Sequence, residues 1–335
     1  MQRRIAVRAM GATCLAPLVP RGMAQVPANA SDRMLLTGRQ LRFTVGYPAG
    51  GVADFAARVV ADGMGQMSGV SSLVENRVGA SGNLAMEYLA KQPADSPMIG
   101  VFANSIVSTN PFVPTLMSRS ANALKDMVPV SAIADMVLVL AVTPNLGVEN
   151  LEQFMAKARA PGQRLKIGLA GSGTPHHLAA LLLERSASLD VTLVPYKGGA
   201  PMIVDVAGGH IDAVFTTIPV GAPLVATGKL RWIAVAQPRT VASLPGIPSL
   251  VGIYKGATIP SWIGAFAASS MPAETLNAFN DALNAAANSP AIAAKLSSNG
   301  LEPLRLSRQE TLAKVNDEVV FMKDLLGKLK VDFST

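Results

Sequence analysis

Short apolar segments alternate along the chain with longer stretches in which apolar residues recur at helical spacing. Leu41–Tyr47 is the first apolar segment, and Asp54–Met67 follows it with apolar positions at Phe55, Val59 and Val60. A strand followed by a helix is the repeating unit of α/β folds with parallel sheets. We therefore predict an α/β fold with mainly parallel sheets flanked by helices.

The alternation runs through most of the chain. Further strands are predicted at Ser72–Glu75, Met98–Ala103, Lys166–Ala170, Val191–Pro195, Ala213–Phe215, Trp232–Ala236 and Ser261–Ala267. Further helices are predicted at Leu84–Ala90, Asn150–Arg159, from His176 onward, at Ala200–Ala207, near Ala222–Thr227, and at Pro272–Asn288, Ala291–Asn299 and Ser307–Lys328. Their regular order indicates sheets built from strand-helix-strand units.

The alternation stops at two places. Val128–Val142 is one long β-prone stretch, and Pro238–Pro260 is rich in proline, glycine and serine. The chain has 335 residues, which is long enough for two α/β domains with separate cores. We predict a first domain of residues 41–140 and 261–335 and a second domain of residues 141–260.

The starts of three helices carry the candidate chemistry. Leu165–Ala180 predicts a strand, then the tight loop Gly171-Ser172-Gly173-Thr174-Pro175, then a helix N-terminus. The first turn of a helix has unpaired N–H donors and a partial positive charge, and small residues before it let an anion approach the backbone. Val45–Val60 and Val194–Val206 repeat this plan. We expect these turns to face one another and to close on a small acid.

Other polar residues lie near the same turns. Asn104 and Ser105 directly follow a predicted strand, and ligands of α/β sheets bind beyond the carboxyl ends of strands. Asp54 comes just after Gly51, where a carboxylate can cap the helix or contact a ligand. Lys197 is either solvated or paired with a bound carboxylate. The sequence leaves the alternatives for Asp54 and Lys197 open.

A hydrolase is the rival hypothesis, and it depends on Ser172 and His177. The chain has no G-x-S-x-G motif, so capping and ligand hydrogen bonding fit Ser172 and Thr174 better than nucleophilic attack. His176 and His177 point about 100° apart on a helix, so they cannot share one metal ion. The glycines match neither nucleotide-binding fingerprint. We therefore expect a binding protein without catalytic residues, metal or other cofactor.

Composition narrows the class further. Hydrophobic residues make up 50% of the chain and charged residues 15%, which is typical of a globular protein. Aromatic residues make up only 5%, which disfavours a protein that stacks nucleobases. The formal net charge of +7 falls to +3 without the four arginines of the first 24 residues. We therefore expect no nucleic-acid partner.

Residues 1–24 resemble a secretory signal peptide. Three arginines precede the short apolar segment Ala9–Val19, and small residues follow it before Gln25. Cys14, the single cysteine of the chain, lies within this segment, so a mature chain would hold neither disulfides nor thiolate metal ligands. We predict an exported protein in which residues 25–40 form an N-terminal lead-in.

Six segments follow one another in a recognisable order. They are YPAGGVADFAAR (Tyr47–Arg58), VENRVGASGN (Val74–Asn83), AGSGTPHHLA (Ala170–Ala179), VPYKGGAP (Val194–Pro201), GGHIDAVF (Gly208–Phe215) and GKLRWIAVA (Gly228–Ala236). In sequence and spacing they resemble the Bug-type extracytoplasmic solute receptors, the periplasmic substrate-binding proteins of the tripartite tricarboxylate transporter family. The resemblance extends from about Leu41 to the C-terminal helix near Leu329.

The resemblance implies a two-domain, hinged periplasmic binding protein, monomeric, that closes on a small organic acid and delivers it to membrane transporter subunits. A ligand-sensing receptor without a transport role stays as an alternative. Carried over by position, the resemblance places the ligand against Tyr47, Gly50, Gly51, Asp54, Asn104 and Ser105 of the first domain and Ser172, Gly173, Thr174, His177, Tyr196, Lys197, Gly198, Gly199 and Thr216 of the second. The family commonly has proline where His176 stands, so this residue is expected to alter ligand choice.

The residues also indicate the number of carboxylates on the ligand. The predicted rim contains Lys197 but no arginine, so helix N-termini would neutralise most of the ligand's charge. A tricarboxylate would leave more charge unpaired in a closed cleft, and burying an unpaired ion is costly. We therefore expect a mono- or dicarboxylate.

Overall fold

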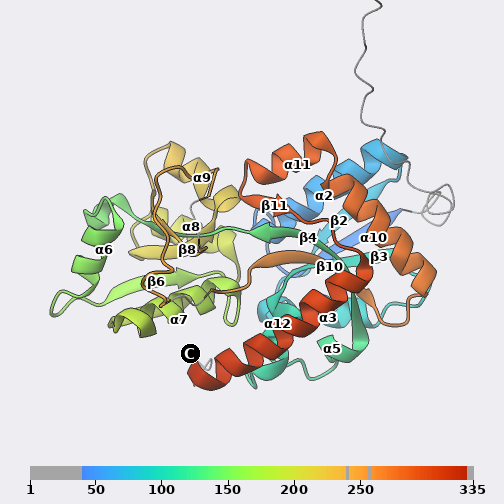
Figure 1. The fold of residues 1–335 in the computed structure, drawn as a ribbon, viewed down its shortest axis with the longest axis horizontal. Helices are drawn as coiled ribbons and strands as arrows, with labels where there is room; N and C mark the ends of the chain where they lie inside the picture. The colour runs from blue at the N-terminus through green and yellow to red at the C-terminus, as the bar shows by residue number, and fades with distance from the viewer. Residues whose placement is uncertain (1–39, 239–240, 256–257, 330–335) are drawn as a thin grey trace, which may run out of the picture.

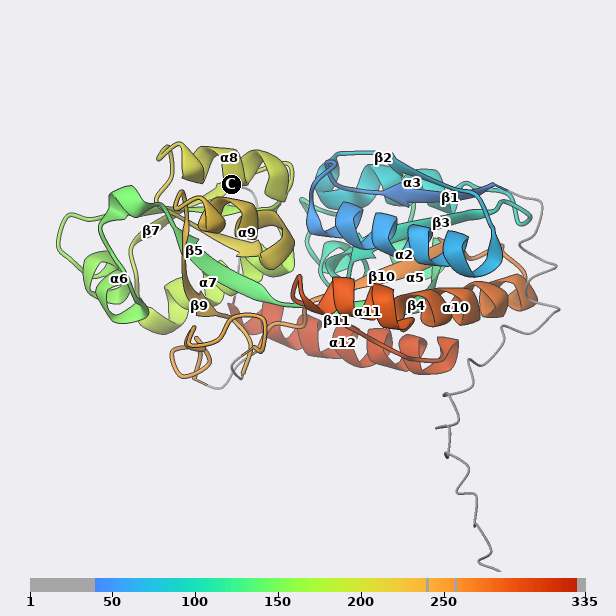
Figure 2. The same ribbon diagram turned by 90° about the horizontal axis from the view of Figure 1, so that it is seen from above.

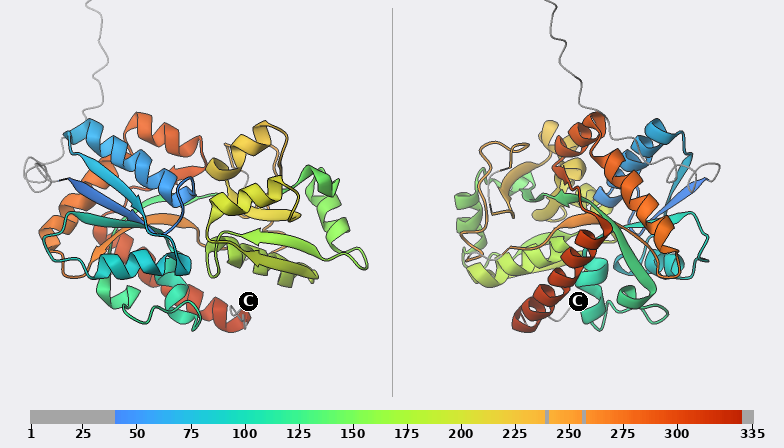
Figure 3. Two further views of the ribbon diagram at one scale, coloured as in Figure 1. Left: turned by 180° about the vertical axis from the view of Figure 1, so that it is seen from behind. Right: turned by 45° about the vertical axis from the view of Figure 1, so that its right-hand side comes forward.

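Two α/β lobes lie side by side in the computed structural model, which describes residues 40–238, 241–255 and 258–329 (Figure 1). The strands of the first lobe are β1 (Leu41–Val45), β2 (Ser72–Asn76), β3 (Met98–Ala103), β4 (Met127–Met136), β10 (Trp262–Ala268) and β11 (Leu301–Pro303). Its helices are α2 (Val52–Ser68), α3 (Asn83–Ala90), α4 (Ser105–Ser108), α5 (Ala123–Asp126), α10 (Ala273–Ala287), α11 (Pro290–Ser297) and α12 (Arg308–Leu329), with the short 3-10 turns η1 (Ala80–Gly82) and η2 (Asn110–Phe112). The two faces of its sheet are covered by α2, α10 and α11 on one side and by α3 and α12 on the other (Figures 1 and 3).

The second lobe is built on a smaller sheet. Its strands are β5 (Leu138–Val142), β6 (Leu165–Leu169), β7 (Val191–Pro195), β8 (Ala213–Thr217) and β9 (Arg231–Val235). Its helices are α6 (Leu151–Ala158), α7 (Pro175–Ala187), α8 (Gly199–Ala207) and α9 (Ile218–Ala226), with the 3-10 turn η3 (Pro144–Leu146). The predicted α/β fold with two helix-flanked sheets is therefore confirmed. The predicted signal peptide (residues 1–24) and residues 25–39 of the predicted lead-in lie outside the described residues.

Both sheets are mixed, because in each of them the strand that enters from the other lobe runs against its neighbours. The strand order is β11-β4-β10-β3-β1-β2 in the first lobe and β7-β6-β8-β5-β9 in the second. β10 lies antiparallel between β3 and β4, and β5 lies antiparallel between β8 and β9. Apart from these two and the short β11, the strands of each sheet point one way, as predicted. Their carboxyl ends therefore collect at one edge of each sheet.

The chain changes lobe at Val137, inside the stretch that reads as one strand in the sequence. β4 ends at Met136 in the first sheet and β5 begins at Leu138 in the second. The Met136 N–H donates to the Ser261 carbonyl at 2.7 Å, and the Val137 N–H donates to the Gly300 carbonyl at 3.0 Å. The predicted division between residues 140 and 141 falls within β5. Every residue from Leu138 to Val142 is buried, so no polar position in the sequence marks the change of sheet.

The central strands are apolar because helices cover both of their faces. All residues of β3, β5 and β10 are buried, and this is why these strands read as continuous apolar runs rather than as alternating patterns. The helices that follow β1, β6 and β8 begin within a few residues of the strand ends. This short connection fixes the helix N-termini at the edge of the sheet where the lobes meet.

Candidate ligand-binding cleft between the lobes

A small cavity lies where the two lobes meet. The N-terminal end of α2 (blue) lies beside the second lobe, close to α9 (Figures 2 and 3). The first lobe lines the cavity with Tyr47, Gly51, Val52, Ala53, Ala103 and Ile263, and the second lobe with Ala170, Thr174, His176, Gly199, Thr216, Thr217 and Val220. The cavity is therefore built from both lobes, by segments that are far apart in the sequence.

Four helix N-termini converge on this cavity. The cap and first turn of α2 supply Gly51, Val52 and Ala53, while α7, α8 and α9 present Thr174, Gly199 and the N-cap residue Thr217. The start of a helix has backbone N–H donors without intrahelical partners and a partial positive charge. No lysine or arginine lines the cavity within residues 40–238, 241–255 and 258–329. The arrangement is therefore suited to an anion held by backbone dipoles rather than by basic side chains.

Three buried polar groups of the second lobe are available to a ligand. His176, Thr216 and Thr217 are 6%, 1% and 1% exposed, and Nδ1 of the histidine and Oγ1 of each threonine have no hydrogen-bond partner in the described part of the chain. Buried polar groups in proteins are almost always hydrogen-bonded, so three that line one cavity indicate a binding site.

Tyr47 provides the polar group of the opposite wall. Its side chain is 9% exposed, and its hydroxyl donates to the Ser81 carbonyl at 3.4 Å. Burial raises the pKa of Tyr47 to about 12, so the phenol stays protonated near neutral pH. Tyr47 is thus a neutral hydrogen-bond group and does not add charge to the site.

The lobes touch directly around the cavity. The Ser81 hydroxyl of the first lobe donates to the Ser172 carbonyl of the second at 2.9 Å. A Cβ atom at Gly198 would lie 2.5 Å from Cδ of Pro48, and one at Gly173 would lie 2.2 Å from Cδ1 of Leu116. The approach of Gly198 to the Pro48 ring requires glycine, and both contacts show that the structure has the two lobes closed on each other.

Five of the residues predicted from the sequence line the cavity: Tyr47, Gly51, Thr174, Gly199 and Thr216. The other ten, which lie beside the cavity or farther off, are Gly50, Asp54, Asn104, Ser105, Ser172, Gly173, His177, Tyr196, Lys197 and Gly198. Several of these ten make hydrogen bonds that hold the turns in contact with the cavity.

Asp54 organises the first turn of α2. Its carboxylate accepts hydrogen bonds from the Gly50 N–H at 3.0 Å, from Arg58 Nε at 3.0 Å and from Asn76 Nδ2 at 2.9 Å. Burial alone would raise its pKa, but these hydrogen bonds hold the pKa of Asp54 below its ordinary value. The carboxylate therefore fixes the loop from inside the first lobe, which is the capping alternative of the sequence analysis.

Asn104 connects the end of β3 to distant parts of the first lobe. Its Nδ2 donates to the Pro260 carbonyl at 3.0 Å and to the buried carboxylate of Glu318 on α12. The same carboxylate accepts the indole N–H of Trp262 at 2.6 Å. Asn104 therefore holds the strand end beside the crossing segment, and Ser105 follows it as a buried residue.

Two of the predicted polar residues of the second lobe, His177 and Tyr196, have hydrogen-bond partners within that lobe. The Gly173 N–H donates to His177 Nδ1 at 3.0 Å, and the Tyr196 hydroxyl donates to Asp205 Oδ2 at 2.6 Å. Burial lowers the pKa of His177 to about 4. Lys197 is exposed and contributes nothing to the cavity wall. Ser172 contributes its carbonyl, which accepts the Ser81 hydroxyl across the cleft.

Two polar residues of the cavity, His176 and Thr217, were not among the predicted ligand contacts. His177 was predicted to contact the ligand and His176 only to alter ligand choice, while the strand before Thr217 was predicted to end at Phe215. The apolar wall was missed as well, and it consists of Val52, Ala53, Ala103, Ala170, Val220 and Ile263. A signal for Thr217 was present, because a threonine placed shortly before a proline is a common helix start, and Pro219 lies in the first turn of α9.

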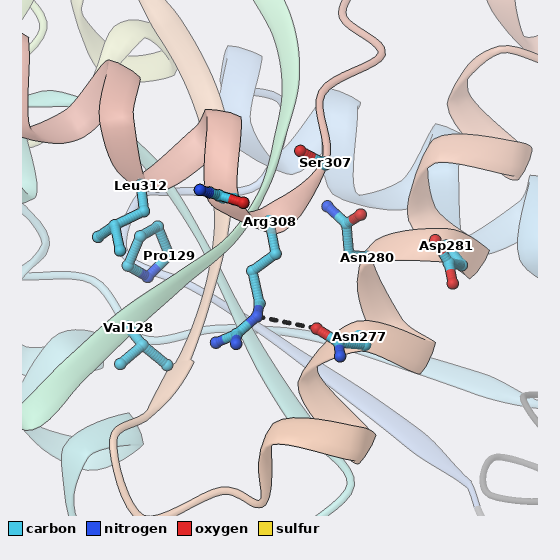
Figure 4. Close-up of a pocket in the computed structure, with 9 residues that line it drawn as sticks. Val128, Pro129, Asn277, Asn280, Asp281, Ser307, Arg308 and Leu312 are labelled. Carbon is cyan, nitrogen blue, oxygen red and sulfur yellow. Dashed lines mark hydrogen bonds between the residues drawn. The ribbon is translucent and has the colours of Figure 1, made fainter.

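A second, wider groove lies on the first lobe between β4, α10 and α12 (Figure 4). Arg308 Nε donates to Asn277 Oδ1 at 3.0 Å across it. The buried amide of Asn280 donates to the Val130 and Leu306 carbonyls at 2.7 and 3.1 Å. None of the buried side-chain atoms that lack a hydrogen-bond partner in the described residues belongs to this groove, in contrast to the interlobe cavity.

Two absences apply to residues 40–238, 241–255 and 258–329, the part of the chain that the structure describes. None of the helices there is both long and apolar enough to cross a membrane. Likewise, no three histidine, cysteine, aspartate or glutamate side chains gather there in a way that could hold a metal ion.

Comparisons with known proteins agree with this geometry. Residues 56–331 match the profile of TctC, the tripartite tricarboxylate transporter family receptor. Protein BugT of Bordetella pertussis is 26% identical over 287 residues, which are 84% of this chain and 86% of BugT. An R. palustris protein with adipate is 28% identical with a TM-score of 0.81, over 88% of this chain and 98% of that one.

MatC from Rhodopseudomonas palustris, with bound malate, has the same fold, with a TM-score of 0.78 over 87% of this chain and 99% of MatC at 23% identity. The matched profile spans most of the residues over which the six ordered segments suggested a resemblance. The chain belongs to the tripartite tricarboxylate transporter receptor family of periplasmic solute-binding proteins, a family of receptors and not of enzymes.

Proposed function

We propose that this protein captures a small aliphatic mono- or dicarboxylate between its lobes and delivers it, as a monomer, to the membrane subunits of a tripartite transporter. The observation that carries the proposal is the convergence of four helix N-termini on one cavity without a basic side chain. Carboxylate oxygens accept several N–H donors at once, and the helix dipoles offset the negative charge.

The apolar wall supports an aliphatic ligand. Val52, Ala103, Val220 and Ile263 offer only hydrocarbon to whatever lies between the polar turns. A sugar would leave many hydroxyl groups without partners against such a wall, and each unsatisfied polar group costs stability. The related R. palustris protein holds adipate, a dicarboxylate with a chain of methylene groups between its acid ends.

Ligand binding should favour the closed arrangement of the lobes. The two chain crossings, at Val137 and before Trp262, are the places where the lobes can turn relative to each other. A ligand held by helix starts of both lobes has more partners in the closed form than in an open one, so it shifts the population toward closure.

A ligand screen by thermal shift and calorimetry tests the proposal. Straight-chain mono- and dicarboxylates should raise the Tm, and a ligand at 100 times its Kd adds about 2.7 kcal/mol to stability. A tricarboxylate, a neutral sugar and a cationic amine complete the panel. Stabilisation by the sugar or the amine alone would contradict a carboxylate site.

Thr216→Val supplies the matching residue test. It keeps the shape of the side chain but removes the unpartnered Oγ1, and a hydrogen bond to a charged ligand contributes about 1.5–3 kcal/mol, so the Kd should rise at least tenfold. Thr227→Val is the control, because Thr227 is exposed at the opposite end of α9. Equal losses of affinity in both variants would mean that Thr216 does not face the ligand.

A further inference from the structure

His176 is the unusual group of the cavity. It is 6% exposed, it lines the cavity from the first turn of α7, and its Nδ1 is without a hydrogen-bond partner in the described residues. The neighbouring His177 differs, because its Nδ1 accepts the Gly173 N–H. The fold therefore presents one imidazole to the ligand and uses the other to hold the loop.

The groups around His176 are nearly all neutral. The polar side chains that share the cavity wall are the phenol of Tyr47 and the hydroxyls of Thr174, Thr216 and Thr217. The titratable groups on the surrounding elements that do not line the cavity include Asp54, Arg58, His177, Tyr196, Lys197 and Asp205. Asp54 is paired with Arg58, Tyr196 is bound to Asp205, and Lys197 is exposed. A second negative charge on a ligand thus meets no permanent cation inside the cavity.

The free imidazole is neutral at physiological pH. Burial lowers the pKa of His176 to about 4, and the positive end of α7 also disfavours a charged ring. With a neutral imidazole, the helix starts alone offset the charge of one carboxylate. A dianion raises the pKa of the ring, because its second carboxylate at close range favours the protonated form.

Building on the proposed function, we propose that His176 recognises the second carboxylate of a dicarboxylate ligand by taking up a proton as the lobes close on it. The proton comes from the solvent and adds to the free ring nitrogen, so one neutral imidazole becomes an imidazolium paired with one carboxylate. No covalent bond of the ligand is made or broken. The pair replaces the arginine or lysine that the cavity lacks.

This mechanism makes selectivity depend on pH. Between the pKa values of the ring in the free and bound protein, dicarboxylate affinity falls by up to about tenfold for each unit of rising pH. A monocarboxylate brings no second charge, so its affinity should be nearly constant over the same range. The preference for a dicarboxylate over a monocarboxylate of equal chain length therefore grows as the medium becomes more acidic.

Calorimetry with adipate and hexanoate tests the inference directly. Each acid is titrated at about pH 6 and about pH 8, above the range in which most aliphatic carboxylates themselves bind protons, in two buffers with different ionisation enthalpies. At about pH 6, adipate should take up close to one proton and hexanoate close to none. Equal proton uptake by the two acids, or none by adipate, overturns the inference.

Two variants assign the proton to a residue. His176→Gln should abolish the proton uptake and the pH dependence of adipate binding while leaving hexanoate affinity within a few-fold of the wild type. His210→Gln is the control, because His210 is exposed and lies outside the cavity. Loss of proton uptake in His210→Gln, or its persistence in His176→Gln, contradicts the assignment.

The wild-type titrations also separate this inference from the proposed function. If neither acid binds at either pH, the carboxylate receptor itself is refuted. If both bind without proton uptake, the receptor stands and the role of His176 is wrong. Because this comparison needs no variant, it holds even where His176→Gln fails to fold.

Discussion

Gly198→Ala is predicted to prevent the lobes from closing. Gly198 caps α8 with a φ of 141°, and a Cβ added there would lie 2.5 Å from Cδ and 3.1 Å from Cγ of Pro48. Pro48 belongs to the other lobe, and its ring is joined to its own backbone, so these atoms cannot rotate away. The methyl group therefore keeps the lobes apart by steric overlap with the Pro48 ring.

Two costs of this substitution can be separated. Forcing extra atoms into a packed contact costs about 1–3 kcal/mol, and here the cost applies to the closed form alone, so the Kd should rise about 5- to 150-fold. Alanine at such a φ also adds about 1–3 kcal/mol of local strain. This strain is present in the open and the closed form alike, so it lowers the Tm of the free protein but not the affinity.

Calorimetry, small-angle scattering and a second-site variant test whether Gly198→Ala prevents closure of the lobes. With saturating ligand, the wild type should give a more compact scattering curve and Gly198→Ala should not. Pro48→Ala removes the atoms that the new methyl group meets, so the double variant should regain most of the affinity. Gly228→Ala is the control, because Gly228 also has a positive φ, of 70°, but nothing lies within 4 Å of its added Cβ. Wild-type Kd and scattering in Gly198→Ala, or no recovery in the double variant, would refute the reasoning.

Two further predictions concern the cleft and its histidines. Ser81→Gly removes the cross-lobe hydrogen bond to Ser172, so ligand dissociation measured by stopped flow should be about fivefold faster. The Tm should not fall, because glycine removes the backbone strain of a serine at φ 52°. Unchanged dissociation would show that this bond is not needed for closure. His176 and His177 both have a pKa of about 4 in the fold against about 6.5 when unfolded, so the unfolded chain binds more protons. The unliganded protein should therefore lose stability as pH falls from about 6.5 to about 4, by about 3 kcal/mol for each histidine, and urea unfolding that is insensitive to pH in this range would contradict the buried neutral rings.

The fold could be predicted because its signals are local. The strands are short apolar runs, and the helix starts are marked by glycine-rich turns such as those at Gly51 and Gly198, so element order follows from neighbouring residues. The place where the chain changes sheet is different. Val128–Val142 is apolar on both sides of Val137, and only pairing with strands from distant parts of the sequence decides which half belongs to which sheet.

The sequence indicated the turns that line the cavity but only part of its side chains. The turns before α2, α7 and α8 supply N–H donors whatever their side chains are, so their sequence pattern was sufficient. The choice between His176 and His177 depends on which way α7 faces in the assembled lobe, and adjacent helical residues differ in direction by about 100°. Thr217 was missed because the strand was predicted to end at Phe215, two residues before its observed end.

The two lobes contribute unequally to the cleft even though their sheets share one strand order. In each sheet the strand from the other lobe lies beside the third strand of the parallel set, which is β3 in the first lobe and β8 in the second. A four-residue helix, α4, follows β3, whereas the nine-residue α9 follows β8 and begins at the cavity. The second lobe therefore presents three helix starts, His176 and three threonines, and the first lobe presents one helix start and most of the apolar wall. We expect the second lobe to hold the charged groups of the ligand and the first lobe to exclude water from its hydrocarbon chain.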